Sequence, residues 1–173
     1  MNKKDFSRNC LADALIDLLE DNKYEDISIQ DIVDKAGFSR MAYYRNFKDK
    51  NEIIDYYLDS IFSSFIEKVD LSYTRHGPEY FFENLFKFFS NDEMVKIASL
   101  FMQRGLVGAI ANQFIKRVQG GFVPNQSQYF YDFLAGGFFA IYLAWIRNGL
   151  KESPEEMTKE AMKYVNYLKE KRV

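Results

Sequence analysis

Residues 28–50 read SIQDIVDKAGFSRMAYYRNFKDK, and this stretch governs the N-terminal part of the chain. Ser28 followed by Asp31 is typical of a helix N-cap with its capping-box partner. Apolar residues then recur at positions 29, 32, 33 and 36, which is the spacing of one helix face. Gly37 should end that helix, because glycine adopts the left-handed cap conformation without strain. Ser39 should cap a second, short helix, so the stretch predicts a helix, a tight turn and a helix.

Two helices joined by a short glycine-containing turn form the helix-turn-helix motif, whose second helix enters the DNA major groove. Residues 35–50 carry five basic side chains and one acidic one, whereas the whole chain has a formal net charge of −2. Contacts from Lys and Arg to phosphates supply most of the non-specific affinity for DNA. The charge pattern therefore favours a DNA-binding motif. A helical hairpin that only packs against the rest of the protein is the alternative for the bare pattern.

Residues 37–50, together with Ile29, Ile32 and Ala36, resemble the DNA-binding domain of the TetR family. The family pattern is roughly TvxxIAxxAGvSxgtlYxyFxxK. Positions 41 and 42, often glycine and threonine in the family, are methionine and alanine here, and Asn46 replaces an aromatic residue or histidine. The resemblance covers about the first third of the chain. It implies a three-helix DNA-binding domain, completed by an amphipathic helix that the apolar stripe predicts over residues 5–21.

The resemblance also implies which residues contact DNA. Arg40 and Met41 are expected at base edges, and Tyr43 near a thymine methyl group or the backbone. The hydroxyl groups of the two capping serines, Tyr44 and the ammonium group of Lys50 are expected at phosphates. The complete expected set is Ser28, Ser39, Arg40, Met41, Ala42, Tyr43, Tyr44 and Lys50.

The composition indicates a globular protein rather than a disordered one. Of the 173 residues, 47% are hydrophobic and 17% are aromatic. A single cysteine, Cys10, cannot form an internal disulfide, and the lone histidine, His76, has no cluster of metal-ligating residues around it. With no glycine-rich phosphate loop either, we expect no enzyme, no cofactor and no metal. No apolar run follows residues 1–5, so we expect no signal peptide and a cytoplasmic location.

Helical periodicity continues through the rest of the chain. A fourth helix is expected from residue 49 or 50 to about 70, followed by a break at 71–77. Further helices are expected over 79–90, 92–102, 106–118, 127–149 and 154–171. The fold class is therefore all-α with about nine helices, divided into a DNA-binding domain, 1–48, and a ligand-binding and dimerisation domain, 49–173. No glycine or proline separates the two domains, so a rigid joint is expected.

Residues 127–149 are apolar on all faces, but the uncharged run 133–146 is shorter than the roughly 20 residues of a membrane span. We therefore expect no membrane association, and a helix buried against both its own domain and a partner chain. In TetR-like proteins the last two long helices pair with their copies. The expected homodimer interface consists of Phe130, Leu134, Gly137, Ile141, Met157, Ala161, Tyr164, Val165 and Leu168.

The leading functional hypothesis is a homodimeric regulator that binds a double-stranded DNA operator and represses transcription until a small apolar or aromatic ligand releases it. Phe62, Phe101, Tyr131 and Phe138 are the expected pocket residues, with ordinary core packing as the alternative. The second hypothesis is an activator controlled by a protein partner. The GG, WIRNG and SPEE segments between residues 136 and 156 resemble the C-terminal domains of short Gram-positive TetR-type proteins, which include dihydroxyacetone-operon activators that need such a partner.

Overall fold

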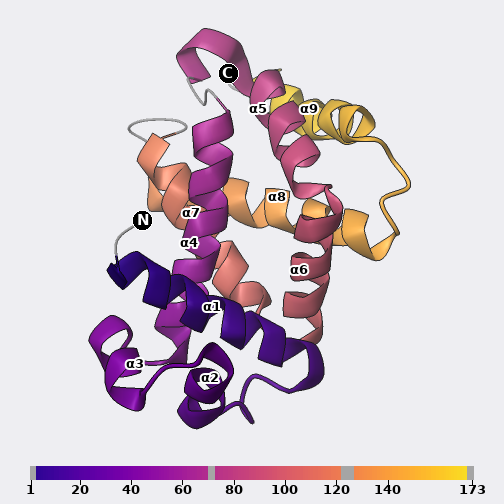
Figure 1. Ribbon diagram of the computed structural model, residues 1–173. Helices are drawn as coiled ribbons and strands as arrows, with labels where there is room; N and C mark the ends of the chain where they lie inside the picture. Colours follow the sequence, from indigo (N-terminus) through magenta and orange to yellow (C-terminus); the bar gives the residue numbers. More distant parts are fainter. Residues whose placement is uncertain (1–2, 70–72, 122–126, 171–173) are drawn as a thin grey trace. The chain divides into compact units, whose positions relative to one another are not determined.

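The computed structural model describes residues 3–69, 73–121 and 127–170. These residues form nine helices and no strand (Figure 1), which confirms the all-α prediction. The helices are α1 (Lys3–Asp21), α2 (Ile29–Ala36), α3 (Arg40–Asn46), α4 (Lys50–Lys68), α5 (Tyr73–Phe89), α6 (Asp92–Gln103), α7 (Val107–Gly121), α8 (Gln128–Arg147) and α9 (Pro154–Glu170).

The ends of α2 follow the capping residues in the sequence. The Ser28 hydroxyl oxygen accepts the Asp31 backbone N–H at 3.2 Å, while the Asp31 carboxylate accepts the Ser28 backbone N–H at 2.8 Å. The Ser28 hydroxyl also donates to this carboxylate at 2.7 Å. These hydrogen bonds from Ser28 hold the pKa of Asp31 below its ordinary value. Gly37 ends α2 with φ of 72°, the left-handed conformation expected of it.

The start of α5 differs from the prediction. A break was expected over 71–77, with a helix starting at Pro78, but α5 already begins at Tyr73. Only Gly77 is non-helical inside it, with φ of 75° and ψ of 179°. Proline disfavours a helical conformation in the residue before it, and glycine accepts the positive φ that results here. Within the described part of this segment, the expected break is thus a kink at one glycine.

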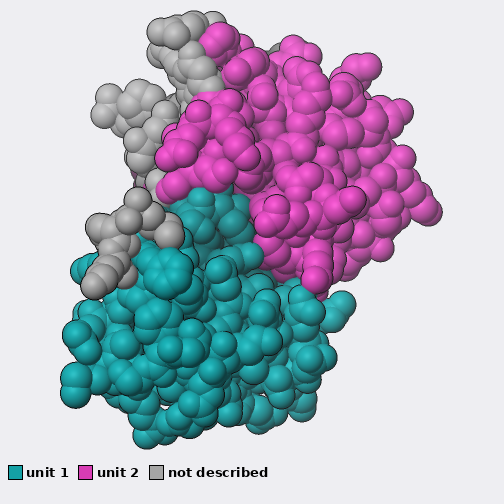
Figure 2. Space-filling view, in the orientation of Figure 1, with its two compact units in different colours: residues 1–61, 100–110 teal, residues 62–99, 111–173 magenta. Residues whose placement is uncertain are grey.

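The chain divides into two compact units (Figure 2). Unit 1 consists of residues 1–61 and 100–110, and unit 2 consists of residues 62–99 and 111–173. Three helices, α4, α6 and α7, contribute residues to both units. The units therefore do not end at residue 48, where the sequence suggested a domain boundary. A division of function at that residue stays a prediction.

Each unit has its own apolar core. In unit 1 much of the core lies between α1, α2, α3 and the start of α4, where Leu11, Leu15, Leu19, Ile32, Val33, Tyr43, Phe47 and Ile53 are almost fully buried. Phe101 of α6 also belongs to unit 1 and is 0% exposed. In unit 2 aromatic rings dominate. The ring of Phe114 lies 6.1 Å from that of Phe62 and 5.1 Å from that of Phe138, and Phe86 packs edge-on against Trp145 at 5.4 Å. Such pairs stabilise a core beyond their buried area.

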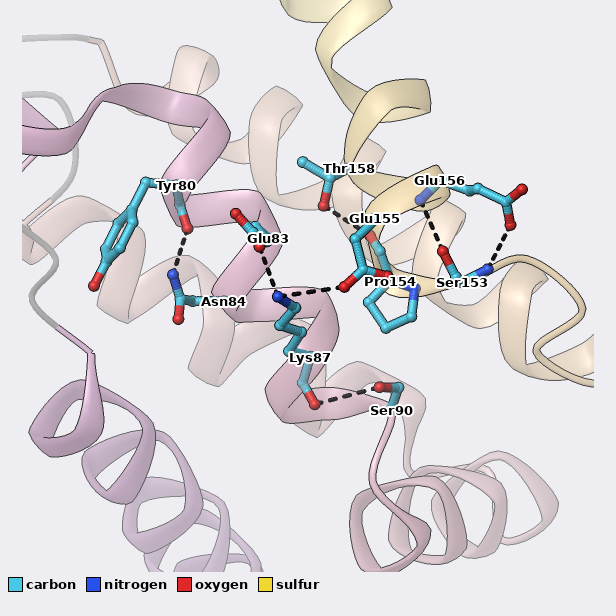
Figure 3. A network of polar contacts seen from close by, with 10 residues as sticks. All are labelled: Tyr80, Glu83, Asn84, Lys87, Ser90, Ser153, Pro154, Glu155, Glu156 and Thr158. Carbon is cyan, nitrogen blue, oxygen red and sulfur yellow. Dashed lines mark hydrogen bonds and ion pairs between the residues drawn. The ribbon is translucent and has the colours of Figure 1, made fainter.

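The start of α9 is fixed on α5 by a polar network (Figure 3). The Lys87 ammonium group lies 2.6 Å from the Glu83 carboxylate on its own helix and 3.3 Å from the Glu155 carboxylate on α9. Ser153 caps α9 by accepting the Glu156 backbone N–H at 3.2 Å, and its own N–H donates to the Glu156 side chain at 2.7 Å. This is the capping box that the SPEE segment indicates. It orients the first turn of α9, whose apolar stripe then packs inside unit 2.

By length and composition alone, α8 is the one helix in the described residues that could cross a membrane. The core helix of a globular protein passes the same test. One face of α8 contributes Tyr131, Ala135, Phe138, Phe139 and Tyr142 to the buried core of unit 2. The absence of membrane association stays a prediction.

Candidate nucleic-acid interface

The short helix α3 presents a row of exposed side chains. Ser39 caps it by accepting the Ala42 backbone N–H at 3.2 Å. Arg40 is exposed, Met41 is 69% exposed and Tyr44 is 60% exposed. Met41 and Tyr44 are three residues apart and therefore lie on the same side of the helix. With Arg40 they form an exposed row on the outer face of α3.

The opposite face of α3 anchors the helix in unit 1. Tyr43 is 0% exposed and Phe47 is 2% exposed. The ring of Phe47 packs edge-on against Tyr56 of α4 at 5.7 Å. The Arg8 guanidinium of α1 lies 4.0 Å from the Tyr56 ring centroid and 5.1 Å from that of Phe47. These contacts from α1 and α4 fix the direction in which α3 points its exposed side chains.

The burial of Tyr43 argues against the expected contact with DNA. Its ring lies in the core, and no described residue offers its hydroxyl group a hydrogen-bond partner. Burial, reinforced by the charge of Asp49, raises the pKa of Tyr43 to about 12. Position 43 corresponds to the apolar position of the TetR pattern and position 44 to its tyrosine. The family pattern therefore distinguishes the two tyrosines, and it was the sequence signal that could have placed Tyr43 in the core.

Lys50 makes contacts inside unit 1, and its expected phosphate contact stays a prediction. Its ammonium group donates to the backbone carbonyls of Tyr24 at 2.7 Å and Ile27 at 2.6 Å, and lies 4.5 Å from the Tyr24 ring centroid. Two of its three N–H donors are thus engaged inside unit 1. The Tyr24 hydroxyl in turn donates to the Asn51 side chain at 2.9 Å. Lys50 therefore ties the loop before α2 to the first turn of α4.

Asn46 is a positioning residue that the sequence analysis missed. Its side-chain amide donates to the Ala42 carbonyl at 2.8 Å and to the Ser7 hydroxyl oxygen at 3.1 Å. The Ser7 hydroxyl donates to the Lys4 carbonyl at 3.0 Å. The departure from the family pattern at position 46 thus replaces a bulky ring by a hydrogen bond that joins the end of α3 to the first turns of α1.

The positive charge near α3 is smaller than the sequence count suggests. The Lys35 ammonium lies 3.5 Å from the Asp17 carboxylate, and that of Lys48 lies 3.6 Å from the Glu52 carboxylate. Exposed pairs of this kind contribute little to stability, so the lysines can exchange their carboxylates for phosphates. Arg40 and Arg45 on α3 complete the exposed basic set. Their exposure keeps a phosphate-binding role open to all four side chains.

Ser28 caps α2, whereas Ser39 and Ala42 lie at the start of α3. The Ser28 hydroxyl both donates to and accepts from Asp31, so its capping role already uses it. The Ser39 hydroxyl accepts one N–H and keeps its own hydrogen as a donor. Ala42 is half-buried. Phosphate contacts from these residues stay predictions.

Comparison with known proteins assigns both parts of the chain. Residues 11–57 match the tetR family of bacterial regulatory proteins. Residues 78–167, more than half of the chain, match the family described as the C-terminal region of transcriptional regulators of TetR type. The chain belongs to the TetR family of transcriptional regulators. Members of this family bind DNA operators and function as dimers.

The proteins similar to the chain include the following two. One is the HTH-type dhaKLM operon transcriptional activator DhaS of Lactococcus lactis, 29% identical over 66 residues. That match covers 38% of this chain and about a third (35%) of the relative. The other is the crystal structure of the TetR family repressor AlkX from Dietzia sp., implicated in biodegradation of n-alkanes. It has a TM-score of 0.51 at 18% identity, with 94% of this chain and 95% of AlkX covered. At that identity the likeness shows the fold alone.

The predicted dimer residues differ in how far the structure exposes them. Gly137 and Tyr164 are exposed, and Phe130, Ile141 and Val165 are half-buried. Met157 and Ala161 are only 7% and 5% exposed because they pack inside unit 2, which leaves little of either side chain for a partner; their place in a dimer interface stays a prediction. The side chains of Leu134 and Leu168 lie outside the described residues. Exposed aromatic residues that the prediction missed are Tyr129, Phe133 and Tyr167.

The four predicted pocket residues are all buried, but they belong to different units. Phe62, Tyr131 and Phe138 lie in unit 2, whereas Phe101 lies in unit 1. Phe114 packs against both Phe62 and Phe138. No group of three or more His, Cys, Asp or Glu side chains in the described part of the chain is placed to hold a metal ion. A ligand at Phe62 and Phe138 would have to displace the ring of Phe114.

Proposed function

We propose that this regulator binds duplex operator DNA through α3 and acts as a homodimer. One observation carries the proposal: the outward row of α3 is exposed while Tyr43 and Phe47 anchor its inward face. A recognition helix needs this division, because its base-reading side chains must protrude from a rigid support.

The side chains on the outer face suit distinct parts of a major groove. Arg40 can donate two hydrogen bonds to the edge of a guanine, and the apolar end of Met41 suits a thymine methyl group. Tyr44 and Arg45 provide hydroxyl and guanidinium donors for phosphates. We therefore assign sequence readout to Arg40 and Met41, and positioning on the backbone to Tyr44, Arg45 and Ser39.

The test of DNA binding uses the region upstream of the protein's own gene in a fluorescence anisotropy titration at several salt concentrations. Binding should weaken steeply with salt, with a logarithmic slope of about −0.9 per phosphate contacted. Arg40→Ala should relax the preference for the bound sequence by about 1–3 kcal/mol at one base pair. Arg147→Ala, which removes an exposed arginine of unit 2, is the matched control and should leave both quantities unchanged. Salt-independent binding, or an unchanged preference in Arg40→Ala, contradicts the proposal.

The homodimer is proposed from the exposed aromatic residues of unit 2. Tyr129 and Phe133 on α8 are 83% and 63% exposed, and Tyr164 and Tyr167 on α9 are 53% and 61% exposed. A closed two-fold dimer would cover such a surface with its own copy. Phe133→Arg should give a monomer in sedimentation velocity, whereas Ile66→Arg, at an exposed apolar residue of α4, should stay dimeric. A dimer in both variants would refute this interface.

Two hypotheses address whether the regulator represses or activates transcription. The first is repression released by a small apolar or aromatic ligand, supported by the buried aromatic residues around Phe62, Tyr131 and Phe138. The second is activation controlled by a protein partner, favoured by the relative that is named a transcriptional activator. Transcription in vitro from the bound promoter separates them. Repression relieved by an apolar ligand supports the first, and stimulation that needs a second protein supports the other.

A further inference from the structure

Arg104 lies in the turn between α6 and α7 and contacts the end of α1, 85 residues earlier in the chain. Its Nε donates to the Leu19 carbonyl at 2.6 Å, and its Nη2 donates to the Glu20 carbonyl. All three residues belong to unit 1. The planar fork of an arginine allows this two-point contact, which a lysine ammonium does not reproduce.

The end of α1 lacks a cation of its own. Its last turn reads LLED and contains no basic residue. The final carbonyls of a helix have no partner within the helix and carry the negative end of its dipole. Asn22 satisfies the Leu18 carbonyl, with its backbone N–H at 3.1 Å and its side-chain amide at 2.9 Å. Arg104 satisfies the next two carbonyls and supplies the missing positive charge.

The backbone around Arg104 is held firmly. Gly105 follows α6 with φ of 72°, and its N–H donates to the Met102 carbonyl at 3.4 Å. The Leu106 N–H donates to the Phe101 carbonyl at 2.9 Å. These two bonds form the Schellman motif that ends a helix at glycine. The side chain of Arg104 therefore moves with the backbone of residues 100–110, which we call the α6–α7 corner.

The α6–α7 corner belongs to a different unit from the residues that precede and follow it in the chain. Residues 100–110 belong to unit 1, whereas the residues on both sides of them belong to unit 2. Within unit 1, α1 packs against α2 and α3, and its Ser7 is bonded to Asn46 at the end of α3. A movement of residues 100–110 can thus reach α3 through direct contacts, from Arg104 to the end of α1 and from Ser7 of α1 to Asn46 at the end of α3.

We propose that Arg104 is a positioning residue that couples the α6–α7 corner to the DNA-binding helices by capping α1. The proposal rests on the proposed function, and it concerns regulation rather than the contact with DNA. Coupling of this kind is reciprocal, so DNA bound at α3 must stabilise the corner as much as the corner stabilises the DNA-bound arrangement. The coupling is therefore measurable without knowledge of the natural effector.

The experiment is hydrogen exchange with mass spectrometry on the full chain, with and without the upstream DNA fragment. In the unaltered protein, DNA should slow exchange in peptides from α3 and also in residues 100–110. The second effect should be about fivefold or more, the lower end of usual allosteric coupling. Arg104→Met, which keeps the aliphatic part of the side chain, should retain the protection of α3 and lose that of residues 100–110.

A second variant separates coupling from simple stabilisation. Arg104→Met combined with Asp21→Lys places a positive charge on the last turn of α1 itself, which should restore helix capping without restoring the link to the corner. In this double variant, DNA should leave the hydrogen-exchange rate of residues 100–110 unchanged. If Arg104→Met alone does not fold, the double variant serves as the test. Equal slowing of residues 100–110 in the unaltered protein and in either variant overturns the proposal. Protection of α3 without any effect on residues 100–110 in the unaltered protein also overturns it. No protection of α3 at all would instead refute the proposed DNA binding.

Discussion

Replacing Tyr43 by phenylalanine should stabilise the protein. Tyr43 is completely buried in unit 1, and its hydroxyl group has no hydrogen-bond partner among the described residues. A buried hydroxyl without a partner costs about 1–3 kcal/mol, because it gives up hydrogen bonds to water and gains none. Tyr43→Phe removes that cost and keeps the ring in the core.

The size of the effect follows from two opposing contributions. Relief of the unpaired hydroxyl favours the variant by about 1–3 kcal/mol. The void left behind is smaller than a methyl group, and its cost stays below about 1 kcal/mol. The free energy of unfolding should therefore rise by about 1 kcal/mol. For a chain of this length, that corresponds to a melting temperature about 2–4 °C higher.

The matched control is Tyr142→Phe in unit 2. The Tyr142 hydroxyl is buried too, but it donates to the Phe89 carbonyl at 3.1 Å. Phe89 is the last residue of α5, so this carbonyl lacks a partner within the helix. Tyr142→Phe should lower the free energy of unfolding by about 1–2 kcal/mol. Urea titrations followed by circular dichroism give both values. Equal destabilisation by the two substitutions would refute the reasoning, and a loss of DNA affinity in Tyr43→Phe would restore Tyr43 to the DNA interface.

Three further predictions concern unit 1. Lys50→Met should lower the free energy of unfolding by about 2 kcal/mol, because two charge-assisted hydrogen bonds to carbonyls are lost. The salt dependence of DNA binding should stay unchanged, whereas a lost phosphate contact would reduce its slope by about 1. Asn46→Ala should weaken DNA binding and speed hydrogen exchange in the first turns of α1, and unchanged exchange would contradict the Ser7 contact. Because Asp31 has a lowered pKa, its stabilising effect is present above the ordinary carboxyl pKa and is lost as the pH falls through the acid range. Acid titrations of the unaltered protein and of Asp31→Asn should therefore differ in slope, and identical curves would show that this carboxylate is not linked to folding.

Local chemistry made most of the helices predictable. The capping residues at Ser28, Ser39 and Ser153 fix helix starts over only three residues of sequence, and Gly37 and Gly105 fix helix ends in the same way. These interactions depend on no distant part of the chain. The order of the helices and their class followed from them.

The orientation of individual side chains was harder to predict. Adjacent residues on a helix point about 100° apart, so Tyr43 and Tyr44 face core and solvent respectively although they are chemically identical. The apolar stripe of α9 suited either a partner chain or the protein's own core, and Met157 and Ala161 pack in the core. Arg104 contacts residues 84 and 85 positions away, which no local pattern indicates.

The discontinuity of unit 1 has a consequence for synthesis on the ribosome. Its second segment ends at residue 110, which follows residue 61 by 49 residues. At about 5–20 residues per second, roughly 2–10 s pass between completion of the two segments. During that interval the carbonyls of Leu19 and Glu20 have not yet met Arg104. The C-terminal end of α1 is therefore incompletely capped until this later segment of the chain has been synthesised. If the ribosome stalls before residue 104, α1 stays in that state.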